Sequence, residues 1–235
     1  IGLGYKTPDA LAVQNTEYPI EQLQPLPENI RAERSIGYNA EVNYKKSFSE
    51  HSSLFINQAF FLTKISRPLI TVEQTSDQVG FINADKPMVT RGFDTYVQFE
   101  VNDWELYAGY TYTIAERKYL PANEFIPLTP RNRMAFVITY VIPEKWRFGL
   151  EGSYTGKQYR DNDTRTPGYM FMAGMIERKL GKAFSVVLNC ENLLDERQSR
   201  HEALYTGPVS NPVFKPLWAP IDGRVVNVSV RWKKN

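Results

Sequence analysis

Residues 35–45 read SIGYNAEVNYK, and this stretch decides the fold class because its side chains alternate without interruption. The even positions are apolar or aromatic, whereas the odd positions, including the final Lys45, are small or polar. Successive side chains of a β-strand point to opposite faces, so a period of two residues is typical of a strand with one wet and one dry side. The stretch therefore predicts a strand whose even face lies against an apolar environment.

The same alternation recurs along most of the chain. It is clear in residues 91–102, 106–114, 134–142 and 226–232, and weaker in residues 52–64, 147–159, 168–180 and 183–194. Gln58 interrupts one apolar row, and Met170, Phe171 and Met172 leave the two faces of residues 168–180 unassigned. With the opening residues 1–6, the pattern predicts about ten strands and no helix. Their length, roughly 10 to 14 residues, exceeds the usual 5 or 6 and is sufficient to cross a membrane at a tilt.

The predicted connections alternate in length. Short turns are expected at residues 46–49, 102–103, 143–145 and 181–182. Long connections are expected at residues 7–31, 67–90, 116–130 and 198–222, with a shorter one at residues 160–167. Brief turns at one end and long loops at the other are typical of outer-membrane β-barrels, whereas a soluble sandwich has no reason to place every long loop at one end.

Composition agrees with this interpretation. Aromatic residues make up 13% of the chain and its mean hydropathy is −0.42. No run of about 20 apolar residues is present, so a membrane-spanning helix is excluded, whereas alternating strands average to a low hydropathy. A net charge of +2, spread along the chain, gives no indication of nucleic-acid binding. The single cysteine, Cys190, falls in an apolar row, and no spacing predicts a metal site, a bound cofactor or a catalytic nucleophile.

Five short motifs carry a resemblance to a known family. They are GYKTP at residues 4–8, TRGFD at 90–94, PLTPRN at 127–132, ENLLD at 191–195 and DGR at 222–224. In this order they resemble motifs of the TonB-dependent receptors, with Asp94 in place of the usual Glu. The family usually ends on an aromatic residue, whereas here Trp232 is followed by Lys233, Lys234 and Asn235. The resemblance implies an all-β fold, an antiparallel transmembrane β-barrel of which this chain supplies about ten C-terminal strands out of 22.

The resemblance also sets expectations for the domain, the partners and the function. Residues 1–235 are expected to be the C-terminal portion of the barrel and a fragment or processed piece, since residues 1–6 read as the middle of a strand. The plug domain, the TonB-contacting box and the first half of the barrel are expected to lie outside this chain. The implied location is the bacterial outer membrane. The implied function is TonB-energised import of a scarce ligand: an iron chelate, haem, cobalamin or an oligosaccharide. The implied partners are outer-membrane lipid and lipopolysaccharide, the remainder of the receptor, the TonB complex and the imported ligand.

The long connections supply the candidate ligand-binding residues. These are His201, Tyr205, Phe214, Trp218, Arg67 and Arg131. His201 is interpreted either as a ligand for metal or haem or as a solvated loop histidine. The proline-flanked stretch with Phe214 and Trp218 is interpreted either as an apolar binding surface or as a loop packed on itself. Seven arginines near the expected outer strand ends either attract an anionic ligand or face lipopolysaccharide and nearby carboxylates: Arg31, Arg34, Arg67, Arg91, Arg131, Arg133 and Arg160.

Two further hypotheses stand beside import. A small outer-membrane barrel enzyme would need histidine and carboxylates that converge at the barrel rim, where only His201 is expected. A soluble β-sandwich that binds glycans would leave its apolar rows as an unusually large exposed surface. No catalytic residue is therefore assigned, and the chain is expected not to be an enzyme.

Overall fold

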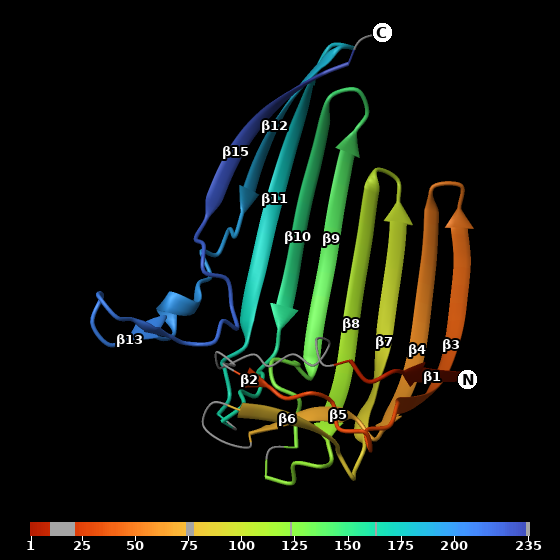
Figure 1. Cartoon of the computed structure of the whole chain (residues 1–235). Helices are drawn as coiled ribbons and strands as arrows, with labels where there is room; N and C mark the ends of the chain where they lie inside the picture. The colour runs from red at the N-terminus through yellow and green to blue at the C-terminus, as the bar shows by residue number, and fades with distance from the viewer. Residues whose placement is uncertain (10–21, 74–77, 123, 163, 234–235) are drawn as a thin grey trace. The chain divides into compact units, whose positions relative to one another are not determined.

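A computed structural model describes residues 1–9, 22–73, 78–122, 124–162 and 164–233. Ten strands form one antiparallel sheet in the order β1-β3-β4-β7-β8-β9-β10-β11-β12-β15 (Figure 1). Their bounds are β1 Gly2–Lys6, β3 Glu33–Ser49, β4 Ser52–Ser66, β7 Met88–Val101, β8 Trp104–Arg117, β9 Asn132–Ile142, β10 Trp146–Thr155, β11 Tyr169–Leu180, β12 Phe184–Glu191 and β15 Val225–Trp232. The prediction of about ten strands is confirmed.

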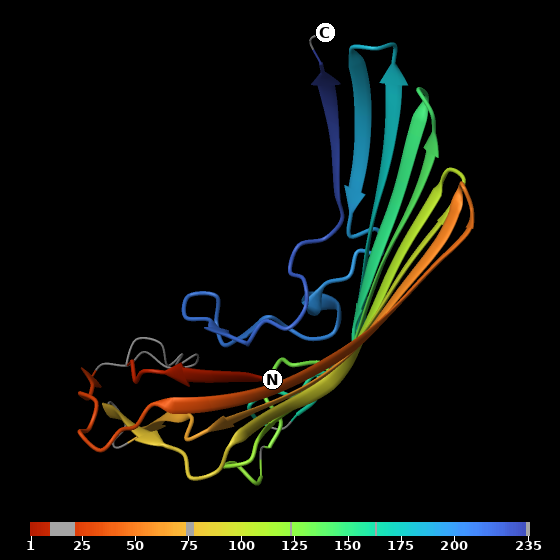
Figure 2. The same ribbon diagram turned by 90° about the vertical axis from the view of Figure 1, so that its right-hand side faces the viewer.

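Contacts divide the chain into two compact units. Unit 1 comprises Ile1–Ala40, Phe60–Gly92 and Thr113–Ile126, and unit 2 comprises Glu41–Ala59, Phe93–Tyr112 and Pro127–Asn235. Within unit 2 the hairpin turns at residues 50–51, 102–103, 143–145 and 181–183 lie at one end of the strands (Figure 2). The alternation of short turns and long connections predicted from the sequence is therefore confirmed.

Unit 1 contains a second sheet that the sequence did not predict. Three short strands, β2 (Gln22–Leu23), β6 (Gln78–Asn83) and β5 (Leu69–Glu73), pair in the order β2-β6-β5. Phe81 is 2% exposed in this sheet. The Asn83 amide donates to the carbonyls of Arg31 and Arg67, at 3.0 Å each, and its oxygen accepts from the Arg31 N–H at 2.7 Å. The long connections expected at residues 7–31 and 67–90 thus form a folded element, apart from residues 10–21 and 74–77, which lie outside the described residues.

Three predicted strand ends are wrong. β3 continues to Ser49 rather than turning at residue 46, because Lys46 lies over the Phe48 ring at 5.1 Å and the row of alternating side chains continues. β12 ends at Glu191 because Asn192 has a φ of 50°, a left-handed conformation that a strand does not accommodate. β10 ends at Thr155, and its pairing with β9 closes with one more hydrogen bond, from the Gly156 N–H to the Asn132 carbonyl at 2.8 Å.

The register of the sheet assigns the faces of β11. Leu150 pairs with Gly174 and Phe148 pairs with Ile176, and directly paired residues of antiparallel strands lie on the same face. The even residues of β11 therefore share the face of the apolar rows, which we call the apolar face. The odd residues, including Glu177, share the opposite, polar face.

Aromatic side chains form two bands on the apolar face. Near the short turns, Trp104 stacks on Tyr140 at 4.5 Å. Near the long connections, Phe93 stacks on Tyr112 at 5.6 Å. On β10, the rise from Trp146 to Tyr154 is about 27 Å at roughly 3.4 Å per residue, or about 20 Å for a strand tilted by about 40°. Two aromatic bands around an apolar belt of this height are typical of the lipid-facing surface of a membrane barrel.

The polar residue in the apolar row of β4 is fully partnered. Gln58 accepts a hydrogen bond from the Thr95 hydroxyl at 2.6 Å and donates to the carbonyls of Asp94 at 3.1 Å and Ala59 at 3.2 Å. An amide without such partners is costly in hydrocarbon, so the neighbouring strand makes Gln58 tolerable there. In the described ranges no helix is long and apolar enough to span a membrane, and the only helical element is one 3-10 turn, η2 (Gln198–Arg200).

The motifs at residues 191–195 and 222–224 meet at the base of the last long connection. Asn192, 2% exposed, donates from its amide to the carbonyls of Glu196 at 2.8 Å and Asp222 at 3.0 Å. The Arg224 guanidinium donates to the Leu193 carbonyl at 2.7 Å. These contacts, which we call the Asn192 clamp, bring the end of β12 and the start of β15 together and leave the residues between them as a closed loop.

Candidate ligand-binding loops

Two connections of unit 2 supply the candidate site. One joins β10 to β11, and the other joins β12 to β15 and contains η2 and the small hairpin of β13 (Tyr205–Thr206) and β14 (Val213–Phe214). Figure 1 shows the second connection in blue, at the end of β11 and β12 away from their shared short turn. Contacts between the two connections determine the geometry of the site.

Trp218 and Glu202 form the centre of these contacts. Trp218 is 6% exposed, and its indole N–H donates to the Glu202 carboxylate at 2.5 Å. The Arg160 guanidinium, from the β10–β11 connection, forms an ion pair with the same carboxylate at 2.6 Å. Lys215 lies 3.5 Å from the second carboxylate oxygen. One carboxylate thus links a ring and an ammonium group of the β12–β15 connection to a guanidinium of the β10–β11 connection.

Gln198 fixes the backbone around Trp218. Its side chain is 0% exposed and bridges two backbone groups: the amide donates to the Pro216 carbonyl at 3.0 Å, and the oxygen accepts from the Trp218 N–H at 2.9 Å. Its own N–H donates to the Pro220 carbonyl at 2.8 Å. The backbone of residues 216–220 is therefore held in one conformation, because the buried Gln198 forms hydrogen bonds with its polar groups.

A second set of contacts fixes Trp218 to the β10–β11 side. The Gln158 amide donates to the Trp218 carbonyl at 3.3 Å, and the Trp218 ring lies 6.0 Å from the Tyr169 ring. The Arg160 guanidinium lies 5.9 Å above the Trp218 ring. We call the assembly of Gln158, Arg160, Gln198, Glu202 and Trp218 the Trp218 latch, and it makes the two connections one rigid surface.

The charge state of Glu202 controls the latch. Burial alone raises the pKa of Glu202, but the hydrogen bond from Trp218 and the positive charges of Arg160 and Lys215 outweigh burial and lower the pKa below its ordinary value of 4.5. The ionised form therefore stabilises the closed latch above about pH 4.5, and this contribution is lost as the pH falls through the lowered value.

We therefore expect the latch to open in acid. Tryptophan fluorescence of the receptor, recorded from pH 7 to pH 3, should show a transition below about pH 4.5. Glu202→Gln removes the titrating group, so the variant should lack that transition and show a more open loop at pH 7. An identical transition in the wild type and in Glu202→Gln would contradict the assignment to Glu202.

A stack of two arginines on one tyrosine lies beside the latch. The Arg165 guanidinium is 4.7 Å and that of Arg131 is 6.0 Å from the centre of the Tyr159 ring. Arg165 also donates to the Tyr159 hydroxyl, and the Tyr159 carbonyl accepts from the Leu128 N–H at 2.9 Å. Two guanidinium groups beside one aromatic ring place positive charge next to an apolar surface, so the stack suits a negatively charged ligand.

The structure brings some of the predicted ligand-binding residues together and separates others. His201 lies 5.4 Å from the Trp218 ring and its Nε2 is 2.5 Å from the Glu196 carboxylate. Tyr205 and Phe214 pair edge to face at 6.2 Å on β13 and β14, with Phe214 73% exposed. Arg67 belongs to unit 1, where it has a φ of 57° and its carbonyl accepts from Asn83.

Ion pairs with carboxylates are observed at predicted arginines of the described residues. Arg160 pairs with Glu202, and Arg91 lies 3.6 Å from Glu116. For these two, pairing with nearby acidic residues is the observed arrangement. Of the candidates, only Arg131 shares an aromatic ring with another arginine, which keeps it as a predicted ligand contact.

The sequence interpretation missed four residues of this region: Gln158, Gln198, Glu202 and Arg165. Gln158, Gln198 and Glu202 have partners far away in the sequence, such as Trp218 for Gln158, so no local pattern identified them. Arg165 contacts Tyr159, six residues earlier, but the spacing of these two residues follows no strand or helix period. Within the described ranges no group of three or more His, Cys, Asp or Glu side chains is placed to hold a metal ion.

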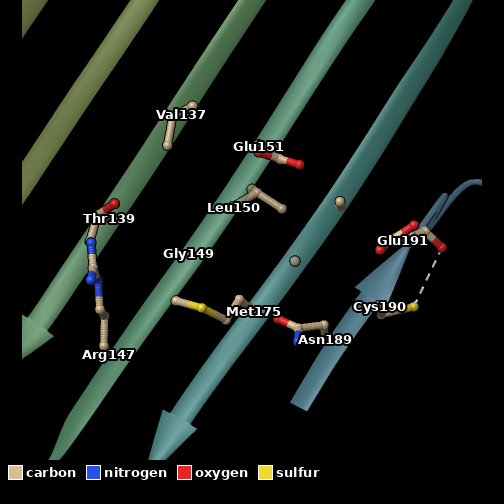
Figure 3. Close-up of a pocket in the computed structure, with 12 residues that line it drawn as sticks. Val137, Thr139, Arg147, Gly149, Leu150, Glu151, Met175, Asn189, Cys190 and Glu191 are labelled. Carbon is tan, nitrogen blue, oxygen red and sulfur yellow. Dashed lines mark hydrogen bonds between the residues drawn. The ribbon is translucent and has the colours of Figure 1, made fainter. Parts of the chain in front are cut away.

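A separate hollow lies on the polar face of the strand wall. It has a volume of about 330 Å³ and is lined by charged and polar side chains that include Arg147, Glu151 and Asn189 (Figure 3). It is open and lies along β9 to β12, so it belongs to the inner surface of the wall rather than to the loops.

Comparison with known proteins agrees with the antiparallel all-β architecture of the strand wall. A family model described as TonB dependent receptor-like, beta-barrel, matches residues 1–193. A variant of the ferric enterobactin receptor PfeA from Pseudomonas aeruginosa, in complex with enterobactin, superimposes with a TM-score of 0.69 at 14% identity, covering 98% of this chain and 37% of that chain.

Two further solved structures are similar. The FrpB iron transporter from Neisseria meningitidis has a TM-score of 0.62 at 16% identity and covers 88% of this chain and 32% of its own. The ferric yersiniabactin uptake receptor FyuA from Yersinia pestis has a TM-score of 0.63 at 18% identity and covers 86% of this chain and 30% of its own. The chain thus spans about a third of the length of these proteins.

Proposed function

Because this chain belongs to the TonB-dependent receptor family of β-barrels, we propose that it is the C-terminal portion of the barrel of an importer that binds an anionic metal chelate at its long loops. The family is one of outer-membrane transporters and not of enzymes, which excludes the barrel-enzyme hypothesis. The ten-stranded sheet with long strands likewise excludes the soluble sandwich.

The observation that carries the proposal is the stack of Arg131 and Arg165 on Tyr159 beside the Trp218 latch. The latch fixes the loops before a ligand arrives, which reduces the ordering cost of binding. The stack supplies positive charge and an aromatic surface. Among iron chelates, haem, cobalamin and oligosaccharides, a negatively charged ferric chelate makes the best use of these groups. The iron and siderophore receptors among the structural relatives are consistent with this choice.

Import requires parts that we assign to the rest of the receptor. A wall of ten strands does not close a wide barrel, so we propose that the plug domain and the remaining strands complete it. In this proposal the TonB complex acts through the N-terminal part. Residues 1–235 contribute part of the barrel wall, outer loops and the first contacts with the ligand, and they catalyse no reaction.

The test is ligand binding by the full-length receptor purified from outer membranes. Ferric citrate, haemin, cyanocobalamin and maltohexaose represent the four ligand classes, and quenching of tryptophan fluorescence reports binding. We expect ferric citrate to bind, and the double variant Arg131→Ala/Arg165→Ala to weaken its affinity about tenfold or more, because two charged contacts are lost. Lys157→Ala, an exposed charge change in the same connection, is the matched control and should bind like the wild type.

Uptake separates binding from energised import. Cells should accumulate iron from radiolabelled ferric citrate, and a protonophore should stop accumulation without affecting binding. Binding of haemin, cyanocobalamin or maltohexaose in place of ferric citrate would overturn the ligand class. Accumulation that persists in the presence of the protonophore would overturn energised import.

A further inference from the structure

The apolar face of β9 to β12 carries a groove of about 490 Å³. Its walls are apolar side chains that include Leu150, Ile176 and Leu188, and its floor is Gly174. This volume lies within the range of sites that hold drug-sized ligands, roughly 300 to 1,000 Å³. The groove lies on the side of the sheet opposite the polar rows, within unit 2, and its lining extends to Leu193 at the start of the β12–β15 connection.

The groove exists because two neighbouring positions of one cross-strand row are small. The register aligns Leu150, Gly174, Cys190 and Val226 across β10, β11, β12 and β15. A Cβ at Gly174 would lie 3.4 Å from the end of the Leu193 side chain and 3.7 Å from the Gly149 carbonyl, so the space above Gly174 is otherwise open.

At Gly152, the other strand glycine on this face, the space above the glycine is occupied by a side chain. The open space at Gly174 is therefore not a general property of glycines on this face. A Cβ at Gly152 would lie 2.5 Å from the Phe136 ring, so this ring already covers Gly152. No aromatic ring covers Gly174 in this way. The sheet thus leaves one notch in an otherwise continuous apolar surface.

A positive charge lies on the same face of β11, two residues beyond Ile176 of the groove wall. Arg178 pairs with Trp146 on the apolar face, and its guanidinium lies 4.5 Å from the centre of the Trp146 ring. Within the part of the chain that the structure describes, Arg178 forms no ion pair with a carboxylate. The rise from Gly174 to Arg178 is about 13 Å along the strand. Because Trp146 belongs to the aromatic band, Arg178 lies at the depth of lipid headgroups rather than in hydrocarbon.

We propose that this groove binds one anionic phospholipid. An acyl chain lies along the notch over Gly174, between Leu150 and Leu188, and the phosphate accepts hydrogen bonds from Arg178. The groove offers an apolar surface to an acyl chain. Farther along β11, the Arg178 guanidinium, which has no carboxylate partner among the described residues, offers hydrogen bonds to the phosphate of the same lipid. The inference depends on the membrane position of the wall and not on the identity of the imported ligand.

Cys190 provides an internal probe, because its thiol lines the groove. The full-length receptor is delipidated in detergent and titrated with phosphatidylglycerol. Native mass spectrometry counts bound lipid, and peptide mass spectrometry measures N-ethylmaleimide modification of Cys190. We expect one tightly bound phosphatidylglycerol per receptor and a loss of Cys190 modification over the same lipid concentrations.

Two variants and two matched controls test the assignment. Gly174→Leu fills the notch and should abolish the single bound lipid, and Arg178→Gln should weaken phosphatidylglycerol binding about tenfold. Ala40→Leu adds the same bulk at an exposed position on β3, and Lys46→Gln removes a cation that likewise stacks on an aromatic ring, Phe48. Both controls should retain the lipid.

Three outcomes would overturn the proposal. One is retention of the lipid by Gly174→Leu and Arg178→Gln. Another is equal loss of lipid from the test and control variants. The third is protection of Cys190 by detergent alone, or by a second receptor copy identified by cross-linking. The electrophoretic mobility of the unheated receptor relative to the heated receptor, measured in parallel, shows whether each variant is folded, and this readout does not depend on the proposed import function.

Discussion

Trp218→Ala is expected to open the last long connection and to reduce ligand affinity more than any other single substitution in the loops. Trp218 is 6% exposed and donates to Glu202. Truncation of a buried tryptophan costs about 3 to 5 kcal/mol, and it also leaves the Glu202 carboxylate with one donor fewer. Hydrogen exchange of residues 196–218, followed by mass spectrometry, should show protection about 100-fold lower or more.

Two substitutions separate the contributions of the ring and its N–H group. Trp218→Phe keeps most of the apolar ring and removes the donor to Glu202, so a smaller loss of about 1.5 to 3 kcal/mol is expected. Phe214→Ala, in the same connection, removes a ring that is 73% exposed and should change protection little. If Phe214→Ala and Trp218→Ala had equal effects, the loop would be held by hairpin contacts rather than by the latch.

Asn192→Ala is expected to have the second large effect, on the stability of the barrel end. Its side chain makes three hydrogen bonds that would be lost: to the carbonyls of Glu196 and Asp222, and from the Glu196 N–H at 2.7 Å. Each buried group left unpaired costs about 1 to 3 kcal/mol. The φ of 50° adds roughly 1 kcal/mol for alanine, because asparagine adopts this conformation more readily. The amount of folded receptor in outer membranes should fall several-fold.

The matched control for Asn192 lies three residues earlier, on β12. The Asn189 amide donates only to the Asn227 side chain, at 2.9 Å in an exposed position, so Asn189→Ala should leave the folded yield unchanged. Asn192→Gly relieves the φ requirement without restoring hydrogen bonds, and it should recover only a small part of the loss. Full recovery by Asn192→Gly would mean that backbone conformation, and not the clamp, is the cause.

Alternation predicted the ten-stranded sheet, because each strand has one face against lipid and the period of two is a local property. The ends of β3, β10 and β12 were less predictable, since they depend on contacts such as that of Lys46 with Phe48 and on the backbone conformation of Asn192. The β2-β6-β5 sheet was missed because its strands are short and pair across long connections.

The candidate site was only partly predictable for the same reason. Aromatic residues in a long loop indicated Trp218 and Phe214, yet the first is buried and the second exposed. The two residues differ because Trp218 forms hydrogen bonds with Gln158, Gln198 and Glu202. Sequence periodicity cannot predict these contacts. Arg131 and Tyr159 are far apart in sequence, so their stacking also required the fold.

The Asn192 clamp has a consequence for the order of assembly. Most neighbours in the ten-stranded sheet are consecutive hairpins, whose pairing is local and therefore fast. β12 and β15 are not consecutive, as β1 and β3 or β4 and β7 are not, so the chain between Glu191 and Val225 must close before they pair. Closing it costs about 2 kcal/mol more than closing a turn of three residues. We expect the clamp to hold the two ends of this connection close together, so that once it has formed β15 pairs with β12 as locally as the second strand of a hairpin.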